Sequence, residues 1–148
     1  MAEEEGHPYT LIEAPYISKH GFDFMVYPKG AFSDLGKLFG AQHVEVGDPH
    51  VDGLFIIKAN DEAKCRALFA NLRIRQLIPV VRESEKFGAG SNQLYFHMTG
   101  HLMTLKEFRP LFELFTETLN QLVEIGSASE HPPIPPEDRP IAPYYPGG

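Results

Sequence analysis

Alternating hydrophobic and polar positions near the start of the chain predict β-strands. Residues 9–17 mix apolar and β-branched side chains, and residues 22–27 alternate until the turn-forming sequence 28–30 ends the pattern. We expect these two strands to be neighbours in one sheet.

Two further strands are predicted after them. Val44 and Val46 point to the same side of a short strand, and residues 47–50 then have the composition of a turn. Residues 54–57 are apolar throughout, as in a strand that is covered on both faces. They are the predicted central strand of the sheet.

Helical spacing replaces this alternation after residue 59. Asn60 or Asp61 can cap a helix whose apolar residues lie three or four positions apart, namely Cys65, Leu68, Phe69 and Leu72. A second helical pattern, which Pro79 should kink or shorten, contains Ile74, Leu77, Ile78 and Val81. A shorter amphipathic helix is predicted upstream, at residues 34–39.

A hairpin and a long helix are predicted in the second half of the chain. Residues 86–92 have the composition of a flexible loop, and residues 93–103 indicate a strand, a turn near Thr99 and Gly100, and a second strand. A capping box, Thr104 to Glu107, then begins a helix that Gly126 ends. Pro110 should kink its start or mark its true first turn. Its apolar stripe contains Phe108, Leu111, Phe112, Phe115, Leu119, Leu122 and Val123.

The order of these elements favours an α+β fold: a mainly antiparallel sheet with helices packed on one face and a long C-terminal helix. Residues 1–126 form the predicted single domain. The composition changes abruptly after it, so residues 127–148 are a predicted extended tail rich in proline and tyrosine.

Composition and charge narrow the possible partners. The chain has 148 residues, 11 Phe, 6 Tyr and no Trp, which suits one domain with a core rich in phenylalanine. A net charge of −7 disfavours docking on a phosphate backbone, so we expect no nucleic acid partner.

The N-terminus is acidic and no apolar run approaches the ~20 residues of a membrane span. We expect a cytoplasmic protein, for which peripheral association with a membrane complex stays open.

Residues 35–61, with the segment Glu45-Val-Gly-Asp-Pro-His-Val-Asp52 before the strand and Asn60-Asp61 after it, resemble a family of uncharacterised bacterial proteins. In that family an acidic E-x-G-D-P-x-F-D motif precedes a strand that ends in two aspartates. The likeness extends from about Phe22 to about Gly126, and the chain departs from it at Val51, where the family usually has an aromatic residue. The resemblance implies a soluble module, sometimes beside membrane spans, without known catalytic residues.

Two groups of residues could bind a metal. Asp48, His50 and Asp52 occupy alternate positions, so an extended backbone would direct all three to one face. However, the flanking proline and glycine indicate a turn, in which aspartates commonly cap the backbone. His97 and His101 have the spacing of metal ligands on a helix, but the alternating residues around them favour strands.

The sequence contains no cysteine or serine in the context of a catalytic nucleophile. Cys65 lies on the predicted apolar helix face, which favours a buried structural thiol over a reactive one. No serine has the sequence context of a hydrolase nucleophile. We therefore predict a protein that is not an enzyme and assign no catalytic, cofactor-binding or metal-binding residue.

Four arginines concentrate positive charge in this acidic chain, at positions 66, 73, 75 and 82. On a continuous helix the spacing of Arg66 and Arg73 would give a basic stripe, which is either a solvated face or a contact for an acidic partner or anionic lipid headgroups. In the tail, proline runs fix an extended chain at low cost in entropy, so Ile134, Tyr144 and Tyr145 are candidate anchors on another subunit.

These features predict a binding or assembly module, an accessory subunit that attaches to a larger and possibly membrane-associated complex. The alternative is a protein that binds a small ligand or metal, or an unrecognised enzyme. Its pocket would be lined by aromatic side chains and polar groups from Asp48, His50, His97 or His101.

Overall fold

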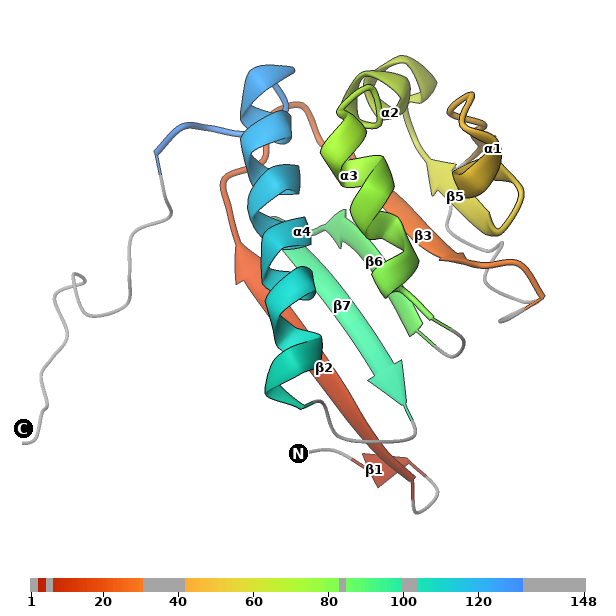
Figure 1. Ribbon diagram of the computed structural model, residues 1–148. Helices are drawn as coiled ribbons and strands as arrows, with labels where there is room; N and C mark the ends of the chain where they lie inside the picture. Colours follow the sequence, from red (N-terminus) through yellow and green to blue (C-terminus); the bar gives the residue numbers. More distant parts are fainter. Residues whose placement is uncertain (1–2, 5–6, 31–41, 83–84, 100–103, 132–148) are drawn as a thin grey trace, which may run out of the picture.

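The computed structural model describes residues 3–4, 7–30, 42–82, 85–99 and 104–131. Within these residues, seven strands form one antiparallel sheet, and the helices cover one of its faces (Figure 1). The predicted α+β fold, with a mainly antiparallel sheet, helices on one face and a long C-terminal helix, is confirmed. The predicted helix at residues 34–39 lies outside the described residues.

The sheet has the strand order β1-β2-β7-β6-β3-β5-β4. Its strands are β1 (Glu3–Glu4), β2 (His7–Pro15), β3 (Phe24–Pro28), β4 (Gln42–His43), β5 (Phe55–Ala59), β6 (Glu85–Gly90) and β7 (Gln93–Thr99). The helices are α1 (Pro49–Asp52), α2 (Glu62–Leu68), α3 (Leu72–Leu77) and α4 (Leu105–Glu124). A 3₁₀ turn at Ile78–Val80 follows α3.

Two predictions about strand positions are wrong. β2 and β3 are not neighbours, because the β6–β7 hairpin lies between them: β2 pairs with β7, and β3 pairs with β6 and β5. β5 is next to the last strand β4 and is not central. Alternate residues of β5 are buried while Ile56 and Lys58 stay partly exposed, and Leu54 is 59% exposed in front of the strand. The apolar residues 54–57 therefore belong to a strand that is covered on one face only, and not on both as predicted.

The third predicted strand is shifted by two residues. β4 covers Gln42–His43, while Val44 is buried and donates from its backbone nitrogen to the carbonyl of Ile57 at 2.9 Å. The predicted turn after it contains the single helical turn α1.

The glycine-rich stretch that we predicted as a loop is strand β6. The hairpin turns at Ser91 and Asn92, whose φ angles of 55° and 65° are left-handed, and not near Thr99, which ends β7. Gly100 to Met103 lie outside the described residues. A strand needs glycine here because a Cβ on Gly88 would lie 2.6 Å from the Tyr95 hydroxyl oxygen and even closer to the carbonyl oxygen of Phe24.

Helices α2 and α3 are capped by polar side chains, as the sequence indicates for the first of them. Asp61 accepts a hydrogen bond from the Lys64 amide at 3.0 Å, which confirms it as the cap of α2. Asn71 caps a separate helix, α3, so Leu72 begins that helix and is 56% exposed instead of buried. The expected effect of Pro79 is confirmed, because α3 stops before it.

The predicted capping box of α4 is confirmed. Glu107 accepts from the Thr104 amide at 2.7 Å, and Gly126, with φ of +80°, follows the helix end. Most of the predicted stripe faces the sheet, but Phe112 is 55% exposed, whereas Leu114 and Thr118 are buried. None of the described helices is both apolar and long enough to traverse a lipid bilayer.

Residues 127–129, which follow α4, are attached to the domain. The Lys19 amide donates to the carbonyl of Ser127 and the Ser129 amide donates to the carbonyl of Ile17, both at 2.9 Å. Ala128 is buried and forms a bridge with Ser18. The end of α4 is thereby fixed beside the end of β2.

The close packing at Gly88 generates a stability prediction. Gly88→Ala should lower the free energy of unfolding by about 1–3 kcal/mol or more, because the backbone oxygen of Phe24 cannot move aside. Gly90→Ala is the matched control in the same strand, since its Cβ would meet Asp23 at an ordinary 3.8 Å. Urea unfolding of both variants measures the difference, and equal stabilities would contradict this account of β6.

Candidate binding surface

The four arginines do not form an open basic stripe. Because α2 and α3 are separate helices, each guanidinium points to a different carboxylate. Arg66 lies 2.7 Å from Glu62, and Arg73 lies 2.6 Å from Glu113 on α4. The remaining pairs are Arg75 with Asp48 at 3.1 Å and Arg82 with Glu107 at 3.0 Å. Their positive charge is thus largely neutralised within the domain.

The aspartates of the 48–52 segment hold the backbone around α1. Asp48 accepts from the His50 amide at 2.9 Å, and Asp52 accepts from the amides of Val46 and Gly47 at 2.9 and 2.8 Å. Although desolvation acts in the opposite direction, the His50 amide and the Arg75 guanidinium lower the pKa of Asp48. Among the residues that the structure describes, no three His, Cys, Asp or Glu side chains are arranged to hold a metal ion.

The other sequence candidates lie apart from one another. His97 is on β7, opposite Leu11 and Lys86, and His101 is outside the described residues. Cys65 is fully buried, and desolvation raises its pKa to about 12. Ile134, Tyr144 and Tyr145 also lie outside the described residues.

A polar hollow of about 410 Å³ lies where two tight turns meet at one end of the sheet. The turns contain four residues with left-handed backbone conformations, His20, Gly21, Ser91 and Asn92. Asn92 joins them by accepting from the Ser18 amide at 3.0 Å. The hollow is lined by Ser18, Gly21, Asp23, Ser91 and Asn92.

Asp23 is the ionisable group of this polar hollow. Partial burial raises its pKa, and burial together with the Asp23 charge raises the pKa of Tyr95 to about 12. Burial and the same charge also raise the pKa of Tyr16, against a smaller opposite effect of Ser18. The residues that line the polar hollow offer one carboxylate, that of Asp23, and the hydrogen-bonding side chains of Ser18, Ser91 and Asn92.

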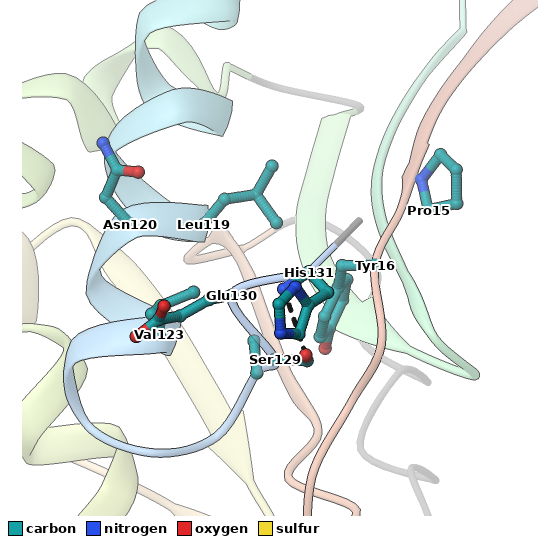
Figure 2. Close-up of a pocket in the computed structure, with 9 residues that line it drawn as sticks. Pro15, Tyr16, Leu119, Asn120, Val123, Ser129, Glu130 and His131 are labelled. Carbon is teal, nitrogen blue, oxygen red and sulfur yellow. Dashed lines mark hydrogen bonds between the residues drawn. The ribbon is translucent and has the colours of Figure 1, made fainter. Parts of the chain in front are cut away.

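An apolar pocket of about 220 Å³ lies between α4 and the end of β2. Leu119 and Val123 of α4 form one wall, and Pro15 and Tyr16 form the other (Figure 2). His131 and Tyr16 both line this pocket, and the His131 amide donates to the Ser129 hydroxyl at 3.1 Å. His131 therefore completes a pocket that is apolar within and polar at its rim.

The pocket adjoins an apolar side of α4, which we call the α4 flank; Leu105 and Phe112 on it are exposed, whereas Phe108, Leu119 and Val123 are partly buried. Its members are spaced three, four and seven residues apart and so share one side of the helix: Leu105, Phe108, Phe112, Leu119 and Val123. Leu105 is 79% exposed, and the rings of Phe108 and Phe112 stack at a centroid distance of 5.4 Å. The opposite side of α4 packs on α3, through Arg73 with Glu113 and Asn71 with Gln121.

Arg109 lies next to the α4 flank and is exposed. It forms no ion pair with any of the described residues, in contrast to the four arginines above. Sequence reasoning missed both Arg109 and the flank, because it assigned the whole apolar stripe to the core. The stripe itself gave no indication of the flank, since seven apolar residues over 16 positions are about the number expected for one core-facing side.

Comparison with protein-family models, with curated proteins and with solved structures found no match. The resemblance described above therefore stays a prediction. The α4 flank with its pocket is the candidate binding surface on geometric grounds.

The burial of Cys65 generates a reactivity prediction. With a pKa of about 12, roughly one thiol in ten thousand is ionised at pH 8, whereas about a quarter would be ionised in an unfolded chain. Reaction with a thiol reagent should be at least about 100-fold slower in the native protein than in denaturant. Similar rates in both would show that Cys65 is accessible.

Asp23 generates a prediction about pH dependence. Its folded-state pKa is raised above the unfolded value, so its contribution to stability is fully present at low pH and is lost as the pH rises through the folded-state pKa. Asp23→Asn should leave stability unchanged near pH 3 and raise it at pH 7, by less than about 1 kcal/mol because solvent screens the site. Denaturant unfolding at both pH values measures this, and a lower stability of the variant at pH 7 would contradict it.

Proposed function

We propose that this protein is a non-catalytic binding module that attaches to a larger protein assembly through the α4 flank. The observation that carries the proposal is the exposed apolar side of α4, with Leu105 at 79% and Phe112 at 55% exposure. Contiguous apolar surface on a folded domain is typical of an interaction site. The partner is another protein that presents an apolar segment with acidic residues.

The chemistry of the flank supports this kind of partner. Stacked aromatic rings contribute large contact areas at little cost in side-chain entropy, which is why aromatic residues dominate binding energies at interfaces. Arg109 adds a positive charge that attracts an acidic group and fixes the register of the bound segment. The pocket at Leu119 and Val123 accepts one apolar side chain.

The wider proposal keeps the expectations drawn from the sequence. The protein acts in the cytoplasm as an accessory subunit, and its assembly can be associated peripherally with a membrane. Arg66 and Arg73 are about half exposed despite their ion pairs, so they can contribute weak, salt-dependent contacts to the partner. The resemblance to a family of bacterial modules without known catalytic residues agrees with a binding role.

The alternative function is binding of a small polar ligand in the hollow around Asp23. The raised pKa of Asp23 and the cavity of about 410 Å³ favour it. The polar groups first considered do not meet there, because Asp48, His50 and His97 line neither the polar hollow nor the apolar pocket. A thermal-shift screen of polar metabolites tests this alternative, with loss of the shift in Asp23→Asn as the required control.

The binding proposal is tested with two substitutions of equal exposure. The partner is first identified by copurification from the native host and then produced in pure form. Phe112→Ser should weaken its binding by about 30-fold, as expected for loss of an aromatic anchor worth about 2 kcal/mol. Leu72→Ser is the matched control, since Leu72 is 56% exposed but lies at the start of α3.

Calorimetric titration of both variants measures the difference. Binding that is weakened equally by both substitutions, or by neither, would contradict the α4 flank as the docking surface.

A further inference from the structure

We infer that the α4 flank is covered by residues 132–148 of the same chain when no partner is bound. The tail would then compete with the partner for one surface and regulate its binding. This inference rests on the proposed function, because it takes the α4 flank to be the docking surface.

The position of His131 is the first argument. His131 lines the apolar pocket between Leu119, Val123 and Tyr16, at the C-terminal end of the α4 flank. The hydrogen bonds of Lys19 with Ser127 and of Ser129 with Ile17 hold the preceding residues beside β2. The tail therefore starts within the docking surface and not at a distance from it.

The chemistry of the tail is the second argument. The sequence His131-Pro-Pro-Ile-Pro-Pro136 favours the polyproline II conformation, which has no internal hydrogen bonds. Segments of this kind bind to surfaces lined by aromatic rings, since their extended form is fixed before binding. Phe108 and Phe112, whose rings stack, supply such a surface on the α4 flank.

The length of the tail matches the position of the unpaired charge. Arg109 lies about 15 to 21 Å along α4 from the level of Leu119 and Val123, because a helix rises about 1.5 Å per residue. A polyproline II chain advances about 3.1 Å per residue, so Glu137 and Asp138 would lie about 19 to 22 Å beyond His131. The two acidic side chains of the tail thus reach the level of Arg109 when the tail runs back along α4.

The apolar residues of the tail fall into the same register. Ile134 would lie about 9 Å beyond His131, at the level between Leu119 and Phe112. Further along, Ile141 lies far enough from His131 to reach past Leu105 at the start of α4. A tail that runs back along α4 in an extended conformation therefore places its apolar residues beside the apolar residues of the α4 flank and its acidic residues beside Arg109.

The covalent link makes even a weak contact effective. A short linker gives the tail an effective concentration in the millimolar range at the α4 flank. If a free tail peptide bound with a Kd of about 0.1 mM, the tail would cover the flank in about nine of ten molecules and lower the apparent affinity of the partner about tenfold.

Paramagnetic broadening in the full chain tests the inference. A nitroxide is attached to Pro136→Cys, while the native Cys65 stays unlabelled because it is buried. The amide signals of Arg109 and Phe112 should lose more than half of their intensity. Leu54, which directly precedes β5, four strands away from β2 in the sheet, is the control and should keep its signal.

Charge substitutions in the full chain provide the matched comparison. Arg109→Glu should restore the Phe112 signal, and adding Glu137→Arg with Asp138→Arg should bring the broadening back. The two tail substitutions alone should restore the signal and strengthen partner binding several-fold. Absence of broadening at Phe112 in the labelled chain, or the same broadening in Arg109→Glu, would overturn the inference.

A mixed sample separates the tail's own domain from a second copy. Isotope-labelled chains without the nitroxide are combined with unlabelled chains that carry it. Broadening that appears only between molecules would overturn docking within one chain. The comparison of Phe112→Ser with Leu72→Ser reports on the proposed function independently, so the tail can fail to dock while the α4 flank still binds the partner.

Discussion

The packing of phenylalanine rings holds the helices against the centre of the sheet. Phe24 lies at its centre, with ring centroids of Phe22, Phe87 and Phe69 at 5.7, 5.9 and 6.0 Å. Phe87 in turn lies 5.6 Å from Phe115 on α4. This cluster connects β3 and β6 to the end of α2 and to α4. Because large buried rings resist displacement, α4 is held rigidly and presents its outer side in a fixed orientation.

The position of the central strand β6 in the sheet requires a residue without a side chain at Gly88. Gly88 allows the Tyr95 ring to lie across β6 and the carbonyl of Phe24 to approach closely. This packing buries the Tyr95 phenol and contributes to its raised pKa. The raised pKa of Tyr95 thus follows from its burial beside Gly88 together with the charge of Asp23.

Local features of the fold could be predicted from the sequence. The capping box at Thr104 and the cap at Asp61 are interactions between residues three positions apart, so the sequence contains both partners. The burial of Cys65 follows from helical spacing in the same way. The order of the strands could not be derived, because it depends on a hairpin turn at Ser91 and Asn92, two residues whose left-handed conformations carry no strong sequence signal.

The candidate surface was harder to predict for a related reason. Periodicity identifies the apolar residues of α4 but not how much of the helix the sheet can cover, so Phe112 was assigned to the core. The pocket at Leu119 needs β2 beside the end of α4, a tertiary contact fixed by the bridge between Ser18 and Ala128. The tail can be predicted from its composition, whereas Arg109 differs from the other arginines only in the folded structure, where those four form ion pairs.

The attachment of residues 127–129 beside β2 also determines how the domain would respond to mechanical load. Tension applied through the C-terminal segment first reaches the bond from Ser129 to Ile17 and then the bond from Lys19 to Ser127. The force passes into the β-sheet before it can unwind the last turn of α4. A subunit that is pulled by its C-terminal end would therefore keep α4 folded until these two hydrogen bonds break.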